Sequence, residues 1–163
     1  NATIEYVRVY LPQHEVAGKT NRMVTYSYSV SPPATAGDGI PNWWRAQHFG
    51  GNGASTNDTS GAFGDPDNDG VNNYAEYIAD TNPTNGSSRL SIQSLFAGTN
   101  RAVFFQSSAN RKYTLYYSTN LISGVWTNVP AQTGIIGNGG VAVFTNSLPD
   151  ATPCFYRVGV AVP

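Results

Sequence analysis

The feature that most constrains this chain is a twelve-residue acidic stretch at positions 65–76, which reads Asp-Pro-Asp-Asn-Asp-Gly-Val-Asn-Asn-Tyr-Ala-Glu. It matches the pattern D-x-[DN]-x-[DN]-G-x5-E at every fixed position. The chain has ten acidic residues, and four of them lie in these twelve positions. Clustered carboxylates repel one another unless a cation lies between them, so the stretch predicts a bound cation.

The spacing is that of an EF-hand calcium loop, in which each position has a defined task. Gly70 takes the sharp turn that lets the chain wrap around an ion. The predicted ligands are the side chains of Asp65, Asp67, Asp69, Asn73 and Glu76 and the backbone carbonyl of Val71, with Asn73 acting directly or through a water. An all-oxygen set favours Ca²⁺ over Zn²⁺, which takes His or Cys. The alternative is a solvated acidic turn.

A degenerate copy of this pattern precedes it at residues 34–45. It keeps an Asp-Gly pair at Asp38 but has no acid at its first, third and twelfth positions, where Ala34, Ala36 and Arg45 stand. We expect no calcium at this copy alone. Asp38 is expected either to cap the next helix or to lend one oxygen to the shared ion. Asp58 and Asp80 are further candidate ligands, although acids in polar loops usually face water.

The acidic loop divides the chain into three stretches. Residues 1–33 alternate polar and apolar side chains at 3–10 and 23–30, which predicts strands, and Pro32-Pro33 ends the stretch. Residues 34–86, the helical segment, are expected to form a small calcium module with short helices near 41–49 and 72–79. Its expected core between the two helices is Trp43, Trp44, Tyr74, Tyr77 and Ile78.

Residues 87–163, the β-segment, read as all-β. Gly, Asn and Pro punctuate six candidate strands at short intervals, and such spacing is typical of a sandwich of two antiparallel sheets. The candidate strands are 89–95, 102–107, 112–118, 125–129, 141–146 and 154–162. The predicted fold class is therefore mainly β, with a two-helix EF-hand-like module ahead of an antiparallel β-sandwich.

Composition excludes several classes of function. The net charge is −1 and 12% of residues are charged, so the chain lacks the basic footprint of a nucleic-acid-binding protein. No apolar run reaches about 18 residues, so no membrane span is predicted. Few Lys and Glu residues with many Asn, Ser, Thr, Gly and Tyr indicate an extracellular β-rich protein. No signal peptide is visible at Asn1, so a mature form or a piece of a longer protein is expected.

The helical segment resembles a bacterial calcium module. Asp-Gly-Ile-Pro-Asn-Trp-Trp from Asp38, the acidic loop, and Asp-Thr-Asn-Pro-Thr from Asp80 carry the resemblance, which covers about residues 36–84. That module is related to thrombospondin type 3 repeats and dockerin loops and recurs near the C-terminus of large secreted or surface proteins. Asn72 stands where paired EF-hands have an apolar residue, so the resemblance implies a structural ion rather than a calcium switch.

Two further resemblances concern the flanking stretches. Arg-Lys-Tyr-Thr-Leu-Tyr-Tyr-Ser from Arg111 and Val-Trp-Thr-Asn-Val from Val125 look like the terminal β-domain that often follows this module. Ile-Glu-Tyr-Val-Arg-Val-Tyr from Ile4 resembles the final strand of glycoside hydrolase family 16 catalytic domains. The latter implies that the chain is the tail of a secreted bacterial polysaccharide hydrolase. The catalytic motif of that family, Glu-x-Asp-x-x-Glu, is absent.

No constellation of reactive residues supports an enzyme. Glycoside hydrolysis needs two facing carboxylates, and the acids outside residues 65–76 form no motif. His14 and His48 have no partner at triad or zinc spacing, and Cys154, the single cysteine, has no base nearby in sequence. We therefore expect a non-catalytic chain.

Aromatic side chains of the β-segment are the candidates for binding sugar, by stacking on the apolar faces of pyranose rings. The predicted contacts are Trp126, Tyr113, Tyr116 and Tyr117. Neighbours in a strand point to opposite faces, so Tyr116 and Tyr117 cannot both lie in the core. The alternative is ordinary packing of amphipathic tyrosines.

Two functional hypotheses follow. The first is a calcium-stabilised accessory region, secreted or on the cell surface, that binds a polysaccharide or cell-surface glycan beside a catalytic domain of the same parent protein. The second is a subunit of an extracellular filament or surface layer, in which strand 3–10 pairs with a neighbouring subunit.

Overall fold

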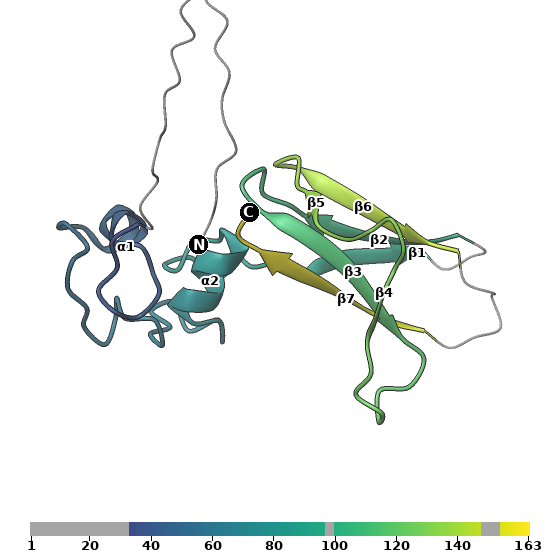
Figure 1. Cartoon of the computed structure of the whole chain (residues 1–163). Coiled ribbons are helices and arrows are strands. Elements are labelled where there is room, and N and C mark those ends of the chain that lie inside the picture. Colours follow the sequence, from purple (N-terminus) through teal and green to yellow (C-terminus); the bar gives the residue numbers. More distant parts are fainter. Residues whose placement is uncertain (1–32, 97–99, 148–153) are drawn as a thin grey trace, which may run out of the picture. The chain divides into compact units, whose positions relative to one another are not determined.

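The described residues of the computed structural model, 33–96, 100–147 and 154–163, contain two short helices followed by seven strands (Figure 1). This confirms a mainly β chain with two short helices ahead of antiparallel sheets. The strands predicted at 3–10 and 23–30 lie outside the described residues, so pairing of strand 3–10 with another subunit remains a prediction. None of the helices described here is long and apolar enough to cross a membrane.

The two helices flank the acidic loop. Helix α1 (Asn42–Phe49) begins after Pro41, whose φ of −61° suits the start of a helix, and ends at Gly50 with a φ of 79°. Helix α2 (Asn73–Ala79) begins after Asn72, whose Oδ1 accepts a hydrogen bond of 2.9 Å from the amide of Ala75. The acidic loop therefore runs directly into a capped helix that carries Glu76.

The first sheet has three antiparallel strands in the order β1-β2-β6, with β1 at Ile92–Phe96, β2 at Arg101–Gln106 and β6 at Val141–Asn146. The second sheet is built around β3 (Lys112–Ser118). Strand β7 (Phe155–Ala161) pairs with β3 along its whole length. The short strands β4 (Thr127–Asn128) and β5 (Ile135–Ile136) must therefore occupy the other edge of β3.

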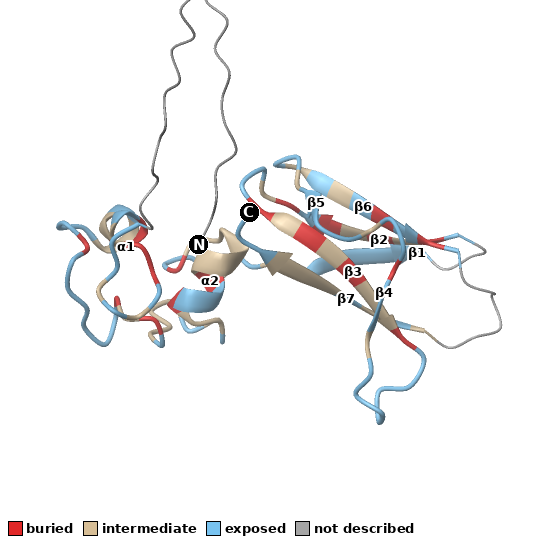
Figure 2. Ribbon diagram, in the orientation of Figure 1, coloured by how far each residue is buried: buried red, intermediate tan, exposed pale blue. Residues whose placement is uncertain are grey.

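Side chains from both sheets meet in one apolar core. The first sheet contributes Val103, Phe105 and Phe144, and the second contributes Tyr113 and Leu115. The ring of Phe105 lies 5.1 Å from those of both Tyr113 and Phe144. Figure 2 shows the buried residues alternating along β2 and β3, as expected for strands with one face on a core.

A second, smaller core holds the helical segment. Ile40, Trp44 and Ala62 are buried, with Phe49 and Tyr77 packed against them. Trp43, expected in this core, is instead 55% exposed, because neighbouring residues in a helix lie about 100° apart and Trp44 takes the inward position. Tyr74 is likewise exposed at 44%.

Candidate metal centre

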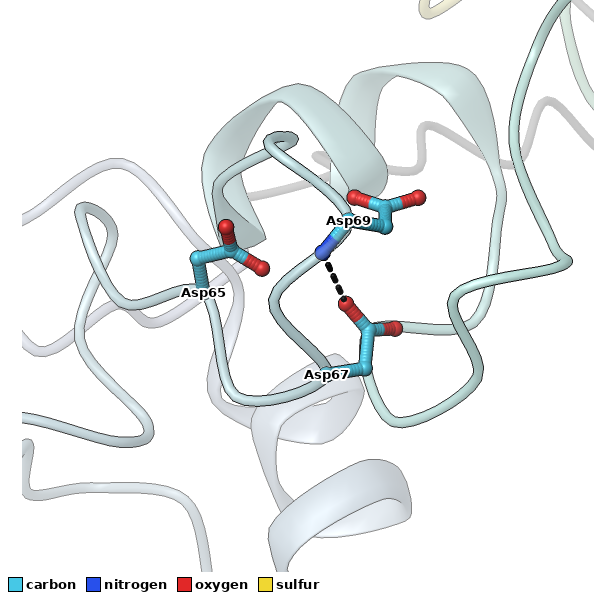
Figure 3. Close-up of side chains that lie close together, drawn as sticks. All are labelled: Asp65, Asp67 and Asp69. Carbon is cyan, nitrogen blue, oxygen red and sulfur yellow. Dashed lines mark hydrogen bonds between the residues drawn. The ribbon is translucent and has the colours of Figure 1, made fainter.

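Three carboxylates of the acidic loop lie close together. Asp65, Asp67 and Asp69 each place one carboxylate oxygen within 4.8 Å of the others (Figure 3). The chain wraps through Gly70, which has a φ of 88°, a conformation that glycine adopts readily. The loop thus turns at Gly70, where its spacing predicts a sharp turn, and brings three of the predicted ligands together.

Each of the three aspartates holds the loop with one oxygen and leaves the other without a donor. Asp65 Oδ2 accepts from the amide of Gly70 at 3.0 Å, Asp67 Oδ1 from Asp69 at 3.3 Å, and Asp69 Oδ1 from Val71 at 2.8 Å. The second oxygens, Asp65 Oδ1, Asp67 Oδ2 and Asp69 Oδ2, are buried and accept no hydrogen bond. Burying a carboxylate oxygen without a partner costs free energy, and a cation bound to these three atoms would offset that cost.

Glu76 supplies a fourth unsatisfied carboxylate from α2. Its side chain is fully buried, at 0% exposure, and lies outside the 4.8 Å group. Oε1 accepts a hydrogen bond of 3.2 Å from Thr81 Oγ1, whereas Oε2 is buried without a donor. Burial raises the pKa of Glu76 to about 7; the hydrogen bond from Thr81 opposes this shift, and the negative charges of the three aspartates add to it.

Asn73 anchors the start of α2 to the loop before it. Its Nδ2 donates hydrogen bonds of 2.7 Å to the carbonyls of Thr59 and Gly61, and its side chain is fully buried. Oδ1 is buried and accepts no hydrogen bond, so it is the one atom of this amide still able to bind a water or an ion. Val71, the predicted carbonyl ligand, lies in the loop just after Gly70.

The degenerate copy at residues 34–45 carries its own cation. Arg45, at the twelfth position, is 1% exposed, and its Nη2 lies 2.6 and 2.7 Å from the two carboxylate oxygens of Asp38. The guanidinium also donates to the carbonyls of Ser60 at 3.0 Å and Gly53 at 2.8 Å. Asp38 neither caps α1 nor joins the cluster of the acidic loop. Its two oxygens instead accept hydrogen bonds from Arg45 and from the amides of Ile40 and Ala62.

The other two additional candidates also lie away from the cluster. Asp58 is exposed, and within the described residues only Asp65, Asp67 and Asp69 come together as a possible metal-holding group. Asp80 ends α2 in the left-handed conformation, with a φ of 61°. Its carboxylate accepts hydrogen bonds from Ser108 and Asn110 and lies 3.4 Å from Arg111, so it serves a contact with the β-segment.

Arg111 ties the end of α2 to the β-segment. It is buried, and its guanidinium donates to the carbonyls of Ile78 at 2.8 Å and Tyr77 at 2.5 Å. These carbonyls belong to the last turn of the helix, where a cation is favourable. The guanidinium also lies 5.6 Å from the Tyr77 ring centroid. The helix that carries Glu76 is therefore fixed to the turn before β3.

The predicted sugar-stacking residues divide between two faces of the second sheet. Tyr113 is 1% exposed in the core, and Tyr117 is half-buried against it, so neither offers an open ring face. Tyr116 and Trp126 lie on the other face, where both contact Arg157. Sequence reasoning did not single out Arg45, Arg111 or Arg157; Arg45 alone carried a signal, its place at the twelfth position of the degenerate copy.

Comparisons of this chain with family models, with curated proteins and with solved structures found no match.

Proposed function

We propose that this chain is a calcium-stabilised, non-catalytic accessory region whose β-segment binds glycan. The observation that carries the calcium site is the set of four buried carboxylate oxygens without donors, one each from Asp65, Asp67, Asp69 and Glu76. Four carboxylates with one such atom apiece match the shell that an EF-hand-like loop builds around Ca²⁺.

Oxygen chemistry favours calcium over other metals at this site. The candidate ligands are carboxylates, an amide and a backbone carbonyl, with no sulfur or imidazole among them. Ca²⁺ takes about six to eight such oxygens in flexible geometry, whereas Mg²⁺ demands a smaller octahedral shell. Calcium would also offset the cost of burying Glu76 in its charged form.

The ion would act on the joint between the two segments. Glu76 and the carbonyls bound by Arg111 lie on the same short helix, α2. Calcium would hold α2 to the acidic loop through Glu76, while Arg111 holds the C-terminal end of α2 to the β-segment. A rigid joint keeps a binding module at a fixed distance from whatever domain it serves, which maintains the effective concentration of that domain at its polymer.

Glycan binding is the second part of the proposal. Tyr116 and Trp126 support it, since they leave the core and lie together on one face of the second sheet. We propose that the two sheets form a β-sandwich and the helical segment an EF-hand-like module of the thrombospondin type 3 and dockerin kind. The parent protein would be secreted by or attached to a bacterium and act on polysaccharide.

Two measurements test this function. Thermolysin digestion with calcium and with chelator should show that the ion protects residues 60–80, and Asp67→Asn should remove that protection. Asp58→Asn, which removes an equal charge from an exposed position, is the matched control. A pull-down on insoluble polysaccharides should retain the chain on at least one polymer. Equal digestion in both conditions would contradict the calcium site, and no retention would contradict glycan binding.

A further inference from the structure

Charge is sharply divided along the chain. Residues 81–163 contain five Lys or Arg residues and one acidic residue, Asp150, which gives a formal charge of +4. Residues 34–80 contain seven acidic residues and one Arg, which gives −6. The net charge of the whole chain is therefore close to zero although the β-segment is cationic, and a cationic segment favours an anionic ligand.

Within the β-segment, one arginine stacks on two aromatic rings. Arg157 on β7 pairs in register with Tyr116 on β3, and these strands run side by side (Figure 1). Its Cζ lies 4.8 Å from the centroid of the Tyr116 ring and 4.7 Å from that of Trp126, just before β4. All three side chains lie on the face of the sheet opposite the core.

The donors of Arg157 are open to a ligand. Across the described residues, this guanidinium makes no hydrogen bond and no ion pair, and the residue is exposed. Stacking on aromatic rings uses the faces of a guanidinium and leaves its N–H edge available. That edge is a planar fork that fits a carboxylate or a sulfate with two parallel hydrogen bonds.

The Tyr116 ring and the Arg157 guanidinium are also held in place in the absence of a ligand. A Cβ atom added at Gly159 would lie 2.8 Å from Cε2 of Tyr116, so the tyrosine ring lies directly over the glycine backbone. Gly159 is the neighbour of Arg157 on the same face of β7, two residues along the strand. A ring and a guanidinium that already lie in position lose little conformational entropy on binding.

We propose that Tyr116, Trp126 and Arg157 form a subsite for an acidic polysaccharide. A carboxylate or sulfate group of the polymer pairs with Arg157, and an apolar sugar face packs on an aromatic ring. This inference rests on the proposed glycan-binding function and names its ligand class.

The other cations of the segment favour a single charged group over a phosphate backbone. Arg111 is buried with its donors on α2, and Arg101 is 9% exposed. Only Arg89, Lys112 and Arg157 remain accessible, too few for the continuous track that a nucleic acid neutralises.

The test compares polymers that share a backbone and differ in charge. Affinity electrophoresis or calorimetry of the full chain would use polygalacturonate against its methyl ester, and carrageenan against its desulfated form. We expect the charged member of at least one pair to bind about tenfold more tightly, and the two pairs distinguish carboxylate from sulfate. Equal binding to charged and neutral members would overturn the inference and leave glycan binding standing. Binding to no polymer would overturn both.

Variants locate the subsite. Arg157→Gln and Trp126→Ala should each weaken binding to the preferred acidic polymer about tenfold with unchanged thermal unfolding. Arg89→Gln, which removes the same charge from an exposed position between α2 and β1, should change binding less than about twofold. Equal losses for Arg157→Gln and Arg89→Gln would show diffuse charge attraction and overturn the subsite. So would tighter binding to poly(dT) or to anionic phospholipid vesicles than to every acidic polysaccharide.

Discussion

The guanidinium of Arg45 lies 2.6 Å from the carboxylate of Asp38, and Arg45 stands at the same twelfth position of its loop that Glu76 occupies in the acidic loop. Both side chains are buried, at 1% and 0% exposure. The first loop thus carries a fixed internal cation, whereas the second brings the carboxylates of Asp65, Asp67 and Asp69 together, with Glu76 buried on the helix that follows. We therefore propose that the helical segment takes up one external ion rather than two.

Removing the internal cation should destabilise the helical segment. Arg45→Met leaves Asp38 without its cation and the carbonyls of Gly53 and Ser60 without the guanidinium donor. We expect a loss of about 3 kcal/mol in the free energy of unfolding, measured by urea denaturation with saturating calcium. Arg45→Lys keeps the charge but not the planar set of donors, so its unfolding free energy should lie between those of wild type and Arg45→Met. An unfolding free energy equal to wild type in Arg45→Met would contradict this role.

Stability without metal should fall as pH rises, because the pKa of Glu76 is raised to about 7 in the folded chain. Between pH 4.5 and 7 the folded protein holds a proton that the unfolded chain releases. The stabilisation that protonated Glu76 contributes to the folded state is therefore fully present below about pH 4.5 and is lost as pH rises through 7. The loss is about 3 kcal/mol at most. Thermal unfolding in chelator from pH 5 to 8 checks the sign, and a melting temperature that rises with pH over this range would contradict it.

Glu76→Gln should have opposite effects with and without calcium. In chelator at pH 8 the amide removes a buried negative charge, so the variant should be more stable than wild type, by up to about 3 kcal/mol. With calcium it should be less stable, because the ion loses a ligand. Differential scanning calorimetry in both conditions measures this crossing. A variant that is less stable than wild type in both would indicate a role in packing alone.

Arg111 should transmit the effect of calcium to the β-segment. Arg111→Met keeps the aliphatic stem but leaves the carbonyls of Tyr77 and Ile78 and the carboxylate of Asp80 without a cation. We expect a loss of about 2 kcal/mol and a smaller calcium-induced slowing of amide exchange in β3 and β7. Arg89→Met is the control, since Arg89 is exposed. If calcium slows amide exchange in β3 equally in wild type and in Arg111→Met, Arg111 does not transmit the effect of calcium.

The parts of the structure that follow local rules could be predicted from the sequence. The acidic loop makes its sharp turn at Gly70 as expected. Helix α2 (Asn73–Ala79) starts one residue after the predicted boundary because Asn72 is its cap. The strand predicted at 112–118 has the bounds of β3. Strand β5 was missed because two residues, Ile135–Ile136, carry no periodicity.

Contacts between distant residues could not be predicted. The alternation along β3 favours burial of Tyr113, Leu115 and Tyr117, because Lys112 and Thr114 on the other face are polar. It does not reveal what Tyr116 contacts on that polar face. Arg111 and Asp80 are 31 positions apart in the sequence, and Arg157 meets Tyr116 only because β7 pairs with β3. Such pairs depend on strand register, which the turn residues here do not fix.

Calorimetric titration of the calcium-stripped protein with CaCl₂ tests the central claim most directly. Wild type should bind one Ca²⁺ per chain, and Asp67→Asn and Glu76→Gln should abolish or greatly weaken that binding, while Asp58→Asn should leave it unchanged. Absence of calcium binding by wild type, or equal binding by Glu76→Gln, would contradict a calcium site at this loop.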